Sequence, residues 1–207
     1  MPTIREARQQ FFRTEGLPAD GGYTDPWFDA SFGPVSYRIR NFDLRADALM
    51  RHDIHHTLTG YATDWRGEVE INAWEFGAGL GNQPWGWVIM LMGFFFGVLL
   101  SPAATFQAFA RGRRSTNLYR GPLDPDILER DLDSVRASLS VVDTVRPTLR
   151  DGAVFLGASI LSCMTAAVLF LPLLGLVLHA SLLRIRNEVV ALTGELASCG
   201  PCCAVAA

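Results

Sequence analysis

Apolar side chains recur at helical spacing along much of the chain, with polar turns between the segments. This periodicity predicts helices at residues 1–16, 43–58, 64–76 and 124–142. Residues 17–37 are rich in Gly, Pro and Asp and predict a loop. Gly60 is a suitable stop for the second helix, and Asp64 is a suitable N-cap for the third. The pattern predicts an all-α protein.

The first of two uncharged segments covers residues 77–110. Its apolar density suits a bilayer core of ~30 Å, but Ser101 and Pro102 interrupt it. Three alternatives stay open: a transmembrane helix, an interfacial or re-entrant helix, and a core helix beside a lipid pocket. Trp85 and Trp87 stand where interfacial anchors are expected, which favours embedding in the membrane.

The second uncharged segment, residues 153–180, is the stronger membrane signal. As one helix it measures ~42 Å, more than a bilayer core of ~30 Å requires. We expect Pro172 to kink or divide this helix, and Arg184 to begin a last helix that ends near residue 196.

These elements predict a helical bundle with one or two membrane-embedded helices. We expect a helical domain at residues 1–150, including the apolar segment 85–109, followed by a transmembrane helix and tail at residues 151–207. Composition agrees, since 49% of the residues are hydrophobic and only 19% are charged. A net charge of -3 and the lack of a basic stripe with aromatic side chains argue against nucleic acid as a partner.

The candidate chemistry is concentrated in three of the four histidines, which lie between residues 52 and 56. Residues four apart share a helix face, so His52 and His56 can bind the same metal ion. Asp53 borders that face, and Glu68 is expected to approach it from the next helix across a short loop. The predicted metal ligands and catalytic groups are His52, Asp53, His56 and Glu68.

Mixed imidazole and carboxylate ligands suit zinc, and also manganese, iron or cobalt, because no thiolate selects a softer metal. His55 is expected either to support a ligand or to face solvent, and His55 and Glu75 are candidate proton carriers. A zinc peptidase would need glutamate in place of Asp53. A phosphohydrolase of the paired His-Asp type would need an upstream histidine, and none precedes His52.

The pattern His52-Asp53-x-x-His56, then eleven residues, then Glu68, resembles the ubiquinone biosynthesis family called coenzyme Q protein four. The similarity includes residues 58–64, the run Gly67-Glu68-Val69-Glu70 and the run Trp74-Glu75-Phe76, and it continues less sharply to about Leu139. The C-terminal membrane segment departs from the family's commoner members.

The resemblance implies a zinc enzyme that removes the carboxyl group from ring carbon one of a polyprenylated 4-hydroxybenzoate-derived precursor and hydroxylates that carbon. The alternative is a non-catalytic protein that binds polyprenyl lipid and organises other enzymes of quinone biosynthesis. The expected partners are the lipid substrate, the membrane, those enzymes and a second copy of the chain.

Residues 1–16 lack the apolar core of a secretory signal, so we expect the metal site on the cytoplasmic face of a bacterial inner membrane. Cys199 and Cys202 have thioredoxin-type spacing, but no helix of useful length is expected after them, which argues against a redox role. The basic cluster of Arg111, Arg113 and Arg114 has three open interpretations: a solvated helix end, a lipid headgroup contact and a site for a phosphate-bearing prenyl substrate.

Overall fold

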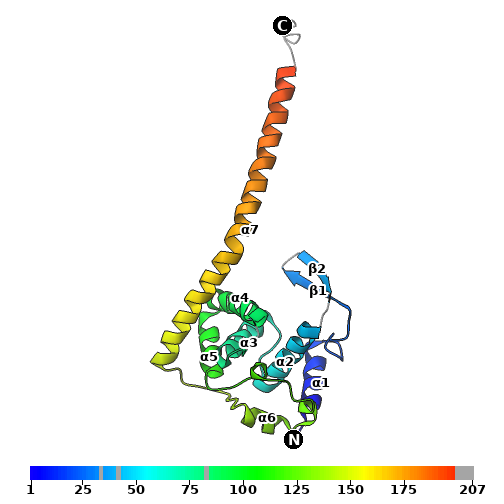
Figure 1. Ribbon diagram of the computed structural model, residues 1–207, viewed down its shortest axis with the longest axis vertical. Helices are drawn as coiled ribbons and strands as arrows, with labels where there is room; N and C mark the ends of the chain where they lie inside the picture. The colour runs from blue at the N-terminus through cyan, green and yellow to red at the C-terminus, as the bar shows by residue number, and fades with distance from the viewer. Residues whose placement is uncertain (33–34, 41–42, 82–83, 199–207) are drawn as a thin grey trace. The chain divides into compact units, whose positions relative to one another are not determined.

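The computed structural model describes residues 1–32, 35–40, 43–81 and 84–198. The predicted all-α class is confirmed, with one small hairpin in addition. The chain divides into two compact units, Met1–Cys163 and Met164–Ala207. The predicted boundary at residues 150 and 151 lies in the first turn of the last helix, α7 (Leu149–Ser198), which runs through both units (Figure 1).

The first unit contains the other helices and two short 3-10 turns. They are α1 (Ile4–Glu15), α2 (Asp43–Thr59), α3 (Trp65–Ala78), α4 (Pro84–Leu100), α5 (Pro102–Gly112), η1 (Leu118–Arg120), η2 (Ile127–Glu129) and α6 (Leu132–Ser138). The predicted stop of α2 is confirmed, because Gly60 has a φ of 77° that suits glycine. The predicted cap of α3 is also confirmed, because the Asp64 side chain accepts a hydrogen bond of 2.7 Å from the Gly67 amide.

A hairpin occupies part of the predicted loop, so the loop prediction is wrong for that part. Strands β1 (Trp27–Phe32) and β2 (Val35–Arg40) pair antiparallel, with Trp27 opposite Arg40. The cause is visible in β2, where apolar and polar residues alternate strictly, as in a half-buried strand. The turn signal at Gly33 and Pro34 lies outside the described residues.

The predicted helix over residues 124–142 is also wrong, because the structure breaks it into η2 and α6. Arg130 is extended, and the Asp131 side chain then starts α6 by accepting a hydrogen bond of 2.9 Å from the Ser134 amide. The apolar pattern still serves the core: Ile127 and Val135 pack in a buried cluster with residues of α1 and α2, namely Ile4, Ile54 and Leu58.

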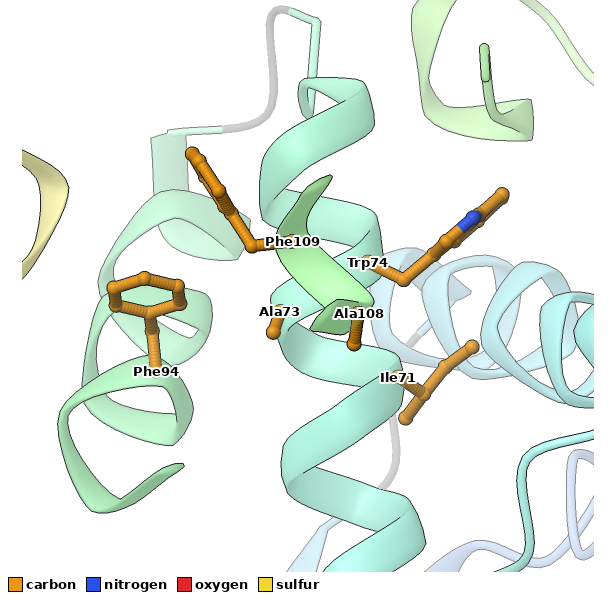
Figure 2. Packing of buried hydrophobic residues seen from close by; sticks show 6 residues of the cluster. All are labelled: Ile71, Ala73, Trp74, Phe94, Ala108 and Phe109. Carbon is orange, nitrogen blue, oxygen red and sulfur yellow. The ribbon is translucent and has the colours of Figure 1, made fainter. Parts of the chain in front are cut away.

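Helix α3 lies at the centre of the main core. Figure 2 shows this core, which comprises Ile71, Ala73, Trp74, Phe94, Ala108 and Phe109. Helices α3 and α5 approach so closely that a β-carbon on Gly112 would collide with the Trp74 carbonyl, and one on Gly77 with the Phe109 carbonyl. This crossing fixes the helix that carries Glu68 and Glu75.

Most of the segment 77–110 lies in two helices, α4 and α5, which are separated at Ser101. Phe94 of α4 is fully buried against α3 and α5, and the Trp87 ring packs edge-on against Phe76 at 5.5 Å. Of the three alternatives, this packing agrees with the core helix. The anchor expected at Trp85 concerns a side chain that is not among those described.

Helix α7 is continuous over Leu149–Ser198 with Pro172 inside it, so the predicted division and the separate last helix are wrong. A helix tolerates proline at the cost of one backbone hydrogen bond. Leu149–Val190 is long and apolar enough to cross a membrane, and among the described residues it is the one helix that meets this criterion by length and composition. Cys199 and Cys202 lie outside the described residues.

The basic cluster is engaged within the fold. Arg113 donates to the Asp151 carboxylate at 2.9 Å and Arg114 donates to it twice at 2.7 Å. Arg111 donates to the Thr59 carbonyl at 2.9 Å and lies over the Tyr61 ring. These guanidinium groups therefore tie the start of α7 and the end of α2 to α5.

Candidate metal centre

Three of the predicted ligands meet where the last two turns of α2 face the first turn of α3. The Nε2 atoms of His52 and His56 are 3.1 Å apart. Each of them lies 3.4 Å from a carboxylate oxygen of Glu68. The ligand atoms of the three residues all lie within 4.8 Å of one another, so this group can hold a metal ion.

The second nitrogen of each imidazole explains why the Nε2 atoms point inward. His56 Nδ1 lies 3.0 Å from the Tyr61 carbonyl oxygen, and His52 Nδ1 lies 3.0 Å from Glu75 Oε1. Both oxygens only accept, so each Nδ1 donates to its partner and Nε2 is the nitrogen left to face the other groups. Two imidazole nitrogens and a carboxylate then converge, an arrangement that a cation stabilises.

The spacing also fits one ion. Zinc binds imidazole nitrogen at about 2.0–2.1 Å, so a single ion can reach two nitrogens that are 3.1 Å apart. Glu68 approaches from the side and is the most exposed of the three side chains, at 41%. The site is thus held on two helices and is open at Glu68.

The titration of the group agrees with a cation site. Burial alone would lower the pKa of His52, but the charge of Glu75 and the hydrogen bonds that His52 donates to Glu68 and Glu75 raise it well above its usual value. Burial raises the pKa of both glutamates, but the neighbouring histidines outweigh it and lower each pKa to about 2. The carboxylates therefore stay ionised and favour positive charge between them.

Asp53, the fourth predicted ligand, lies outside this group of three. Its carboxylate accepts a hydrogen bond of 2.5 Å from the Tyr23 hydroxyl and is only 7% exposed. Tyr23 belongs to the segment before β1, and no pattern in the sequence connects it with Asp53. A ligand or catalytic role for Asp53 stays a prediction.

His55 is fully buried and does not face solvent. Its Nδ1 donates to Glu75 Oε1 at 2.6 Å, and its Nε2 accepts the Leu118 amide at 3.0 Å. Burial lowers the pKa of His55, which favours the neutral ring. Both nitrogens are used, so His55 supports Glu75, and Glu75 in turn orients His52.

The chain matches no family model, no curated protein and no solved structure. The resemblance stated above therefore rests on the motif residues.

Residues distant in sequence complete the surroundings of the site. The end of α2 is held by Arg136 and Arg111, which donate to the carbonyls of Leu58 and Thr59. The Phe11 ring of α1 stacks on the His56 ring, with centroids 5.4 Å apart and planes inclined by 19°. Sequence reasoning missed these contacts, because each of them joins elements more than forty residues apart.

An open pocket of about 630 Å³ lies between α1 and the turn that connects α2 with α3. Phe11, His56, Tyr61 and Ala62 are among its walls, and Arg13 and Glu15 give it a polar side. This pocket brings one predicted ligand, His56, to a space that can admit a small aromatic molecule.

Proposed function

We propose that the chain is a metal-dependent enzyme of ubiquinone biosynthesis. In this proposal it removes the carboxyl group from ring carbon one of a polyprenylated 4-hydroxybenzoate-derived precursor and hydroxylates that carbon. The observation that carries the proposal is the convergence of His52, His56 and Glu68 in the motif spacing of the coenzyme Q protein four family. Helix α7 supports it, because a substrate with a long prenyl tail stays in the bilayer.

Zinc is the proposed ion, held by His52, His56 and Glu68. A bound divalent ion would supply Lewis-acid stabilisation of the negative charge on a phenolate or carboxylate oxygen. Glu75 keeps the Nδ1 of His52 protonated, which leaves Nε2 available as a ligand. Exchanging a carboxyl group for a hydroxyl group is a two-electron oxidation, so the assay must supply an oxidant such as dioxygen.

The proposed location is the bacterial inner membrane with the site facing the cytoplasm. The long apolar helix supports membrane association. A membrane location also explains how an enzyme reaches a substrate that does not dissolve in water.

A host that lacks this gene provides the test. It is complemented with wild type, His52→Ala or Glu68→Ala, and the lipid extract is analysed for quinone and for precursor that retains its carboxyl group. His179→Ala, in α7, and Glu70→Ala, two residues after Glu68, are matched controls. We expect the two site variants to accumulate carboxylated precursor, and the controls to restore the quinone. Full restoration by both site variants contradicts an enzymatic role.

The organiser alternative has one observation in its favour: the three ligands come from two helices, so an ion bound there also fastens α2 to α3. It predicts that variants that fold, reach the membrane and retain their partners restore the quinone without the metal. Metal analysis of the purified wild type by elemental mass spectrometry applies to both proposals. A metal-free active wild type contradicts the enzymatic proposal and shows that no ion fastens α2 to α3.

A further inference from the structure

Arg8 of α1 is a buried guanidinium that the fold satisfies only in part. The residue is 8% exposed, and its Nε and Nη1 atoms have no hydrogen-bond partner among the described residues. Burying a charge without hydrogen bonds is costly, so native proteins rarely retain such a group without a use for it. Arg5, one turn earlier on the same helix, is instead exposed and pairs with Glu129.

The unsatisfied groups of the described residues belong to side chains that border helix α2, which carries the histidines. Besides Arg8, the buried atoms without a partner are Trp74 Nε1 and Glu75 Oε2. Glu75 bonds to His55, and the Trp74 ring lies 5.3 Å from the His55 ring. The histidine helix is therefore bordered by polar atoms that the chain itself does not satisfy.

Aromatic rings hold Arg8 in place beside this helix. Its guanidinium carbon lies 5.4 Å from the Phe12 ring centroid and 5.6 Å from that of Tyr23. Tyr23 in turn donates to Asp53, the neighbour of His52. Phe11, about one turn after Arg8 on α1, stacks on the His56 ring. One face of α1 thus presents a cation and aromatic rings next to the proposed ligands.

Burial raises the pKa of Asp53 and the charge of Arg8 opposes that rise, so Asp53 balances Arg8 only in part, and two guanidinium nitrogens still have no hydrogen-bond partner. The two side chains form no ion pair, and the hydrogen bond of 2.5 Å to Asp53 comes from Tyr23. A guanidinium forms strong, directed hydrogen bonds with a carboxylate. The aromatic neighbours of Arg8 favour a ligand in which that carboxylate is attached to an aromatic ring. A phosphate dianion is less suitable, because Asp53 lies close by and would repel a second negative charge.

We propose that Arg8 binds the carboxylate of an aromatic acid and so positions the acidic ring of the substrate beside the metal centre. This inference rests on the proposed function, since it names the residue that recognises the group to be removed. Arg8 is then the residue that distinguishes a precursor with its carboxyl group from one without it.

The test compares an acid with its neutral analogue. Binding of 4-hydroxybenzoate and of 4-hydroxybenzamide is measured by calorimetry with the full chain in detergent micelles, at constant metal content. Wild type is expected to bind the acid at least about tenfold more tightly than the amide, because hydrogen bonds to charged groups are the stronger ones. Arg8→Gln should remove this preference and leave amide binding unchanged, whereas Arg5→Gln should behave as wild type.

Two results overturn the inference: a wild type that does not prefer the acid, and a folded Arg8→Gln that retains the preference. If Arg8→Gln does not fold, nitrogen NMR of arginine-labelled wild type replaces it. The acid, but not the amide, should then shift a buried arginine side-chain resonance, and the absence of such a shift overturns the inference.

Binding is measured without turnover, so the two proposals can fail separately. An Arg8-dependent preference in a chain that does not consume precursor contradicts the proposed function alone. Equal turnover of carboxylated precursor by wild type and Arg8→Gln contradicts the inference about Arg8 alone.

Discussion

The ligand group of His52, His56 and Glu68 contrasts with the inner cluster of His55 and Glu75, although all three histidines lie on the last two turns of α2. In the ligand group each imidazole uses one nitrogen for a protein acceptor and turns the other toward its neighbours. In the inner cluster His55 uses both nitrogens within the protein and is fully buried. The same residue type thus has two roles within five positions.

What separates the two roles is the number of partners that the fold supplies. A histidine with both nitrogens satisfied contributes to folding, because removing it leaves buried groups without partners. A histidine whose second nitrogen faces other polar groups instead depends on a cation there, either a proton or a metal ion. Glu75 links the two sets, since Oε1 accepts from His52 and from His55.

The largest effect is expected from removing a ligand. His56→Ala and Glu68→Ala should each lower the affinity for Zn²⁺ by more than about 100-fold, beyond the 10–100-fold typical of a supporting residue. Competition with a metallochromic chelator measures this, with His179→Ala as control. Unchanged zinc affinity in both variants would show that the ion binds elsewhere.

His55→Ala should act on stability. We expect the free energy of unfolding of the metal-free chain to fall by about 3 kcal/mol, since the Leu118 amide and Glu75 lose a partner and a cavity is left. Zinc affinity should fall less than in His56→Ala. Chemical denaturation in micelles measures the first quantity, and a loss below about 1 kcal/mol would remove the distinction between the two sets.

Glu75→Gln tests whether Glu75 connects the ligand group to the inner cluster. The amide keeps the size of the side chain but loses the charge that helps to orient His52, so zinc affinity should fall by about 10–100-fold. The same chelator competition measures it, with Glu70→Gln as the control on α3 outside the ligand group. An effect as large as that of Glu68→Ala would place Glu75 among the ligands.

The smallest effect is expected from pH. The pKa values of Glu68 and Glu75 are lowered to about 2, so their stabilisation is present above about pH 4.5 and is lost as the pH falls toward 2. The pKa of His52 is raised, so its contribution is complete below about pH 6.5 and is lost as the pH rises through the folded pKa. The metal-free chain should therefore have its highest melting temperature, from these groups, between about pH 4.5 and 6.5.

Zinc should reverse the fall in melting temperature that the metal-free chain shows above about pH 6.5. Protons compete with zinc for His52, so zinc affinity should rise with pH until the raised pKa of His52 is passed. Melting curves with and without zinc from pH 5 to 8 measure the fall and its reversal. A stabilisation by zinc that does not depend on pH would argue against His52 as a ligand.

Hydrophobic pattern predicted the helices that border the site, and it failed where a local preference competed with it. Helices α2 and α3 follow from periodicity with a glycine stop and an aspartate cap. The break before α6 depends on the Asp131 side chain, which starts a new helix where the apolar stripe continues. Strand β2 depends on an alternation that the glycine- and proline-rich surroundings concealed.

Apolar content also did not determine which of the two uncharged segments packs in the core and which forms a long exposed helix. Helix α4 has 17 residues and packs against α3 and α5, whereas α7 runs for 50 residues and has many exposed leucines. Length and the availability of a packing partner decide between core and membrane helix. Neither quantity follows from counting apolar residues.

The sequence by itself determined that two histidines and a glutamate approach one another, because helical spacing and a short loop fix residues four and twelve positions apart. Only the tertiary structure decided the state of each side chain, because that depends on partners remote in sequence. The Tyr23 hydroxyl donates to Asp53, the Leu118 amide donates to His55, and α1 places Phe11 against His56 and Arg8 beside Tyr23. Such contacts leave no periodic trace, since they arise when separate elements pack together.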